Sequence, residues 1–85
     1  MKFNLYYFAQ LREVIGVNQE QIDCPEHVTT VASLRTWMAG RGVPYADAFA
    51  ANQTVRCAVN RTMALDTQVL ISECEIAFFP PVTGG

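Results

Sequence analysis

Both ends of this chain carry a short segment in which apolar and polar side chains alternate, and one clear amphipathic helix lies between them. In residues 2–8 (KFNLYYF) every second side chain from Phe3 is apolar, and residues 75–79 (EIAFF) repeat the pattern. Such alternation is typical of a strand with one buried face. One sheet packed on one helix would bury the apolar side of all three elements. The strand side chains expected in the core are Phe3, Leu5, Tyr7, Ile76 and Phe78.

The helix is expected in the segment TTVASLRTWMAG, directly after Thr30. Threonine is a favourable N-cap because its hydroxyl accepts a hydrogen bond from a free amide of the first turn. Val31, Leu34 and Met38 recur at helical spacing and form one apolar stripe. Gly40 is expected to end the helix.

Weaker patterns fill the rest of the chain. Residues 9–16 predict a short helical turn that Gly16 ends, and residues 17–23 predict a strand that returns beside the first. Residues 54–60 (TVRCAVN) predict another strand, followed by a short strand or turn within residues 63–71. This order predicts an α+β fold of the ubiquitin-like β-grasp type. In that fold a mixed sheet packs on one main helix, with the first and last strands adjacent in the middle.

Two aromatic side chains are expected on the open face of the sheet, away from the helix. The alternation sends Phe8 and Phe79 to that face, and the adjacency of their strands brings them close together. Apolar residues make up 51% of the chain and charged residues only 16%, so some apolar surface is available for a partner. Arg12 lies on the turn after the first strand and Arg61 on the turn before Met63. They are either ordinary surface charges or a rim that orients a partner.

Length and charge exclude several classes of function. We expect one domain, with a folded part at residues 1–81 and a flexible reactive tail at residues 82–85. The net charge of -2 gives no general attraction to nucleic acid or to an anionic membrane. No apolar run approaches the ~18 residues of a membrane span, and the N-terminus has no apolar signal core. A cytoplasmic location is therefore expected.

The histidine and the three cysteines do not form a metal motif. Cys24 and His27 have the spacing of half a zinc site, but the other half is missing, so we expect no metal and a surface turn at His27. Without an export signal the cysteines are expected to be reduced thiols. Cys57 and Cys74 are expected to pack as small apolar side chains, and Cys24 is expected to be exposed beside Pro25.

The segment FFPPVTGG closes the chain with an unusual combination of residues. Pro80 and Pro81 cannot donate hydrogen bonds to a sheet, so the last strand is expected to stop at Phe79. Gly84 and Gly85 carry no side chains, so the backbone of another protein can close around them. The reactive group at the tip is the α-carboxylate of Gly85, which activation as an acyl-adenylate would open to a nucleophile. The connecting residues of this arm are Val82 and Thr83.

Activation of that carboxylate requires ATP, and the sequence contains no glycine-rich phosphate loop. We therefore expect that this chain binds no cofactor and that another polypeptide uses the ATP. The carboxylates of Asp66, Glu73 and Glu75 are interpreted as solvated charges, since acid–base catalysis would need a cleft.

Four segments resemble the small subunit of molybdopterin synthase, a MoaD-type ubiquitin-like sulfur carrier. YYFAQLREVIG is similar to the opening strand and turn of that family, TTVASLR to its helix start and CAVNRTMALDT to its central strand and turn. EIAFFPPVTGG is similar to its C-terminal signature and is the most specific segment. One stretch departs from the family: TQVLISECEI stands where an Asp-Gly-Asp turn is common.

The resemblance implies that Gly85 is adenylated by an enzyme related to ubiquitin-activating enzymes and is then converted to a thiocarboxylate by a sulfur donor protein. The charged carrier would dock on the large synthase subunit through Phe8, Met63 and Phe79. Its tail would enter the active site of that subunit and give sulfur to cyclic pyranopterin monophosphate, in molybdenum cofactor biosynthesis. The small subunit would have no catalytic activity alone, and the assembly would be a heterotetramer.

Three other functions remain open from the residues. A sulfur carrier for thiamine, tRNA thiolation or cysteine synthesis would share the fold, the tail and the adenylation. A ubiquitin-like modifier would instead form isopeptide bonds through Gly85. A plain interaction domain would have an inert tail.

Overall fold

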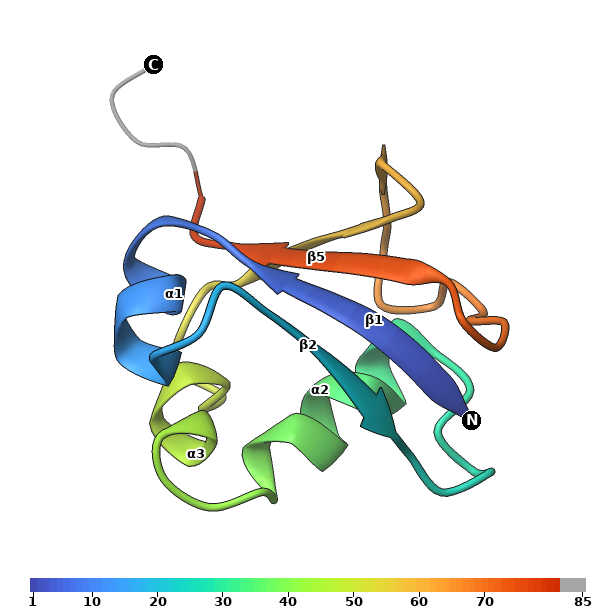
Figure 1. Cartoon of the computed structure of the whole chain (residues 1–85), viewed down its shortest axis with the longest axis horizontal. Helices are drawn as coiled ribbons and strands as arrows, with labels where there is room; N and C mark the ends of the chain where they lie inside the picture. The colour runs from blue at the N-terminus through green and yellow to red at the C-terminus, as the bar shows by residue number, and fades with distance from the viewer. Residues whose placement is uncertain (82–85) are drawn as a thin grey trace.

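The first and last strands lie side by side in the middle of a mixed sheet (Figure 1). β1 (Lys2–Tyr7) pairs in parallel with β5 (Glu75–Phe79) and antiparallel with β2 (Gln19–Asp23). β3 (Arg56–Val59) pairs antiparallel with both β5 and β4 (Thr62–Met63). Within residues 1–81 the strand order is β2-β1-β5-β3-β4. The predicted α+β fold, with the first and last strands adjacent in the middle of a mixed sheet, is confirmed.

The computed structural model describes residues 1–81 of the chain. The expectations for Val82, Thr83, Gly84 and Gly85 therefore lie outside the described residues. The division into a domain at 1–81 and a tail at 82–85 stays a prediction.

The helices α1 (Ala9–Ile15), α2 (Val31–Ala39) and α3 (Tyr45–Ala48) lie on one side of the sheet (Figure 1). Thr30 is the N-cap of α2, as predicted, and its hydroxyl accepts from the Ser33 amide at 3.2 Å. The Ser33 hydroxyl in turn accepts from the Thr30 amide at 2.9 Å, which completes a capping box. This second hydrogen bond was not predicted from the sequence. The predicted turn at residues 9–16 is a helix, and it ends at Gly16 with a left-handed φ of 93°.

The core lies between the sheet and α2. All five strand side chains predicted for the core are at most 1% exposed, and the α2 stripe of Val31, Leu34 and Met38 is fully buried. Phe78 meets the Phe49 ring edge-on, with centroids 4.9 Å apart. An edge-to-face contact adds stabilisation beyond the buried area.

All three cysteines are buried, and the expectation that Cys24 is exposed is wrong. The Cys24 amide donates to the Met1 carbonyl oxygen at 2.7 Å, so the β1–β2 pairing continues one residue beyond Asp23. Side chains two residues apart in a strand share a face, so Cys24 turns inward with Ile22. Cys57 and Cys74 pack in the core as predicted, and burial raises the pKa of the Cys57 thiol to about 11.

The stretch that departs from the family pattern is anchored by two buried side chains, Leu70 and Cys74. The Leu70 amide donates to the Thr29 carbonyl oxygen at 2.8 Å and ties the stretch to the start of α2. Glu73 has a left-handed φ of 67°, a conformation that glycine adopts at little cost. The chain thus makes its turn before β5 without the glycine that the resemblance led us to expect.

A polar cluster ties the edge of the sheet to the segment between α2 and α3. The Glu20 carboxylate accepts hydrogen bonds from the Tyr7 and Tyr45 hydroxyls, both at 2.8 Å, and from the Arg41 guanidinium at 3.0 Å. The Arg41 guanidinium lies 3.9 Å from the centroid of the Tyr45 ring. Burial alone raises the pKa of Glu20, but the hydrogen bonds from Arg41 and the two tyrosines outweigh it, so the pKa lies below its ordinary value.

The Glu20→Gln variant is expected to lose about 1–3 kcal/mol of unfolding free energy at pH 7, because a neutral amide replaces a charged acceptor. The lowered pKa means that ionised Glu20 stabilises the fold above the ordinary value of 4.5, and that this stabilisation is lost as the pH falls through the folded-state pKa. Urea unfolding at pH 7 and pH 3 measures both effects, and the difference between the variant and the unmodified chain should narrow at pH 3. Glu13→Gln, at an exposed site on α1, is the control and should change neither value. An unchanged stability of Glu20→Gln at pH 7 would contradict the role of this cluster.

Candidate functional site

An apolar patch lies on the face of the sheet that carries no helix. The strand register places Ala58 between Ala77 and Met63 on this face. The Phe8 amide donates to the Phe78 carbonyl oxygen at 3.2 Å, so Phe8 lies next to Phe79 where β1 and β5 end. We call Phe8, Ala58, Met63, Ala77 and Phe79 the open-face patch.

The patch is continuous and accessible. Phe8 is 48% exposed and Met63 is 59% exposed, while Phe79 is half-buried. Ala58 is only 9% exposed although it lies outside the core cluster, so its neighbours on the open face cover it. An accessible apolar surface of this kind is typical of a protein-binding site. Whether Phe8, Met63 and Phe79 bind a partner stays a prediction.

The two arginines predicted as a rim lie far apart. Arg12 is exposed on α1, one turn after Phe8. Arg61 lies in the turn between β3 and β4, where its Nε donates to the Glu75 carboxylate at 3.4 Å. Glu75 begins β5, so Arg61 is at the opposite end of that strand from Phe79.

Arg56 lies beside the open-face patch, although it was not predicted as a site residue. Arg56 is exposed and pairs in register with Phe79 on β5. In residues 54–60 the apolar Val55, Cys57 and Val59 alternate with Arg56 and Ala58, so the pattern places the Arg56 side chain away from the core. That signal would have been sufficient to add Arg56 to the site.

β5 ends at Phe79 as predicted, directly before Pro80 and Pro81. Both prolines are half-buried, so they lie against the body of the domain. The chain therefore leaves the sheet at the same end of β5 where Phe8 and Phe79 lie. The four residues that follow are outside the part of the chain that the structure describes.

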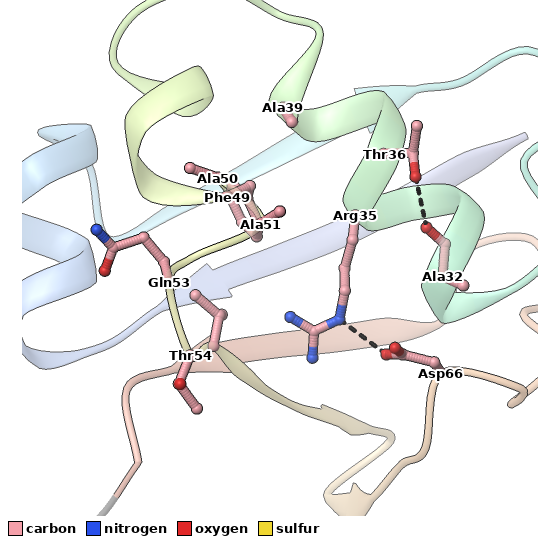
Figure 2. A pocket seen from close by; sticks show the side chains of 11 residues that line it. Ala32, Arg35, Thr36, Ala39, Phe49, Ala50, Ala51, Gln53, Thr54 and Asp66 are labelled. Atoms are coloured by element: carbon pink, nitrogen blue, oxygen red, sulfur yellow. Dashed lines mark hydrogen bonds and ion pairs between the residues drawn. The ribbon is translucent and has the colours of Figure 1, made fainter.

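A hollow of about 630 Å³ lies on the helix side of the molecule, between α2 and residues 49–55 (Figure 2). Four of its eleven lining residues are alanines, and the Arg35 Nε lies 2.9 Å from Asp66 Oδ1 at its edge. Asp66 is the one carboxylate that lines it. The hollow therefore lacks the second titratable group that general acid–base catalysis would need.

His27 is exposed in a turn after β2, as predicted. Among residues 1–81, no group of three or more His, Cys, Asp or Glu side chains is placed to hold a metal ion. Within the same range, no helix is both long enough and apolar enough to cross a membrane.

Comparison with known proteins places the chain in a family. The model of the ThiS family matches residues 5–85, which is nearly the whole chain. The chain belongs to the ThiS family. Within this family, the molybdopterin synthase sulfur carrier subunit of Haemophilus influenzae is 40% identical over 83 residues, which cover 96% of this chain and 98% of that protein. The protein of the same name from Escherichia coli is 38% identical over 93% of this chain and 94% of its own length. The resemblance to the small subunit of molybdopterin synthase is thereby confirmed.

Two solved structures share the fold of this ThiS family member. A Pyrococcus furiosus protein, provisionally named molybdopterin converting factor subunit 1, superposes with a TM-score of 0.79 at 26% identity and covers 96% of this chain and 99% of its own. The small archaeal modifier protein 1 of Haloferax volcanii gives a TM-score of 0.73 at 21% identity over 95% of this chain and 98% of its own. The second likeness concerns the fold alone. A β-grasp fold therefore does not decide between a sulfur carrier and a modifier.

Proposed function

We propose that this chain is the sulfur carrier subunit of a molybdopterin synthase. The observation that carries the proposal is its identity of 38–40% to two proteins of that name, over at least 93% of this chain. The open-face patch agrees with such a role, because a carrier must bind at least one other protein. We propose that the protein carries out this function in the cytoplasm, the location expected from the sequence.

In the proposed cycle, the reacting group is the α-carboxylate of Gly85. An activating enzyme uses ATP to form the acyl-adenylate, and pyrophosphate leaves. A sulfur donor protein then supplies sulfur at the oxidation level of sulfide, which bonds to the acyl carbon of Gly85. AMP leaves, and Gly85 carries a thiocarboxylate. A thiocarboxylate sulfur is a better nucleophile than a carboxylate oxygen, and it is delivered without free sulfide.

The large synthase subunit would receive the charged tail and bind cyclic pyranopterin monophosphate. The open-face patch, with Phe8, Met63 and Phe79, would dock on that subunit. Gly84 and Gly85 would allow its walls to close around the backbone. Water would then hydrolyse the bond between Gly85 and the transferred sulfur, so that Gly85 again carries a carboxylate. On this proposal the chain has no catalytic activity alone, and the assembly contains two large and two small subunits.

The test is the intact mass of the purified chain after incubation with ATP, the adenylating enzyme and the sulfur donor from the same organism. We expect a mass increase equal to the replacement of one oxygen by sulfur. A chain that lacks Gly85 should show no increase, because its terminal carboxylate is one residue short of the position that the enzyme activates.

The absence of a mass increase, with an activating enzyme shown to work on another carrier, would overturn the proposal. A mass increase without binding to the large synthase subunit would indicate a sulfur carrier for another pathway. Conjugates between Gly85 and lysines of other proteins would instead indicate a modifier.

A further inference from the structure

A small pocket lies between α1 and α3, beside the point where the chain leaves the sheet. Its volume is about 210 Å³. The apolar side chains that line it come from four segments of the chain: Leu11 and Val14 on α1, Ala48 on α3, Val55 before β3, and Pro80 after β5. We call it the α1–α3 pocket. Figure 1 places α1 and α3 at the end of the sheet where β5 stops.

The size of this pocket and its apolar side chains fit one apolar side chain of a partner. The rest of the lining is polar and consists of Gln10, Asp47, Gln53 and Thr54. Sites for small molecules usually have volumes of about 300–1,000 Å³, so a pocket of about 210 Å³ is small for a cofactor or a substrate. Leu11 and Ala48 are buried in its base, while Val14 is 50% exposed at its edge. Val14 is half-exposed although its spacing from the buried Leu11 and Ile15 puts all three on one face of a helix.

The α1–α3 pocket is continuous with the open-face patch. Pro80 is a wall of the pocket and directly follows Phe79, which belongs to the patch. Phe8 belongs to the patch and is the N-cap of α1, the helix that carries Val14. A protein that encloses the chain beyond Pro80 would therefore reach both the patch and the pocket.

We propose that the large subunit of the synthase inserts one apolar side chain, the size of leucine or phenylalanine, into the α1–α3 pocket. This inference rests on the proposed function, because it takes its partner from there. Interface side chains that fill a pocket near the centre of a contact carry much of the binding energy. The inserted side chain would contact Pro80, which precedes the tail, from the side opposite the open-face patch.

The test compares Val14→Lys with Val17→Lys, using the full chain and the purified large subunit in titration calorimetry. Val14 and Val17 are 50% and 44% exposed, so neither substitution removes a core side chain. Both add one positive charge near the end of α1, but Val17 lines a different hollow on the far side of Gly16. We expect Val14→Lys to weaken binding about tenfold or more, which corresponds to about 1.4 kcal/mol or more for a lost anchor. We expect Val17→Lys to change it less than about twofold.

Each outcome separates this inference from the proposed function. Equal affinities for Val14→Lys and the unmodified chain would overturn the pocket inference and leave the proposed function intact. Equal weakening by both variants would also overturn it, since the added charge alone would explain the loss. If the unmodified chain does not bind the large subunit, the proposed function fails as well.

A second measurement does not depend on the stability of a variant. In the unmodified chain, the methyl NMR signals of Val14 and Leu11 should shift when the large subunit is added. The methyl signals of Val17 should keep their positions. Unshifted Val14 and Leu11 signals at saturation would overturn the inference.

Discussion

The Phe79→Asp variant is expected to lose at least about 100-fold in affinity for the large synthase subunit. Phe79 is half-buried, lies between the exposed Phe8 and the exit of the chain at Pro80, and belongs to the open-face patch. Truncation of a central aromatic anchor typically costs 2 kcal/mol or more. A carboxylate buried against an apolar partner surface adds a desolvation cost, which the neighbouring Arg56 on β3 would offset only in part. Titration calorimetry with the purified large subunit measures the loss.

The matched control is Ile71→Asp. Ile71 is also a large exposed apolar residue, at 65%, but it lies in the turn before β5, at the opposite end of that strand from Phe79. Both variants add one negative charge, so a general charge effect would weaken both equally. Thermal unfolding followed by circular dichroism should show that both variants fold. Near-normal affinity of a folded Phe79→Asp chain would place the contact with the large subunit on another surface.

The core and the strand order could be predicted because few arrangements bury three apolar faces in a chain of this size. Phe3, Leu5 and Tyr7 alternate with polar residues, and the α2 stripe has helical spacing, so each element indicates which side it must bury. Their packing then fixes the neighbours of β1 and β5. The lengths of α1 and β4 could not be predicted in the same way, because short elements depend on contacts with distant segments.

Cys24 and Glu73 show where local reasoning was insufficient. Cys24 follows a weak strand and precedes a proline, a context that favours a surface turn. Its burial depends on a backbone hydrogen bond to Met1, 23 residues earlier. Glu73 takes a left-handed φ where glycine was expected, and its carbonyl oxygen accepts from the Asn4 side chain at 3.0 Å. Both conformations depend on partners in β1 that the local sequence does not specify.

The candidate site was predictable to the extent that it follows strand alternation. Phe8 and Phe79 could be assigned to the open face from their own strands, and Met63 came from the family resemblance. The charged residues around the patch could not be assigned without the strand register. Arg61 lies beside Glu75 at the far end of β5, whereas Arg56 lies beside Phe79. The α1–α3 pocket could not be predicted from the sequence, because its apolar walls come from four segments that only the fold brings together.

The Phe78→Ala variant is expected to lose about 3–5 kcal/mol of unfolding free energy, which is the typical cost of removing a buried phenylalanine. Phe78 is fully buried, meets Phe49 edge-on and stacks on Tyr7 with centroids 6.5 Å apart. The Arg35 guanidinium lies 5.9 Å from the centre of the same ring, so truncation also removes a cation–π contact. Small domains are typically stable by only about 5–15 kcal/mol, so a large part of the stability would be lost. Urea unfolding followed by circular dichroism measures the change.

The control for Phe78→Ala is Phe79→Ala, one residue further along the same strand. Phe79 points to the opposite face and is half-buried, so its truncation leaves no core cavity and should cost much less stability. Binding to the large subunit should show the reverse order among folded chains, with the greater loss from Phe79→Ala. Phe78, on the core face of β5, would then mainly determine stability. Phe79, on the open face, would mainly determine binding of the large subunit. Equal loss of stability in the two variants would contradict this assignment of faces.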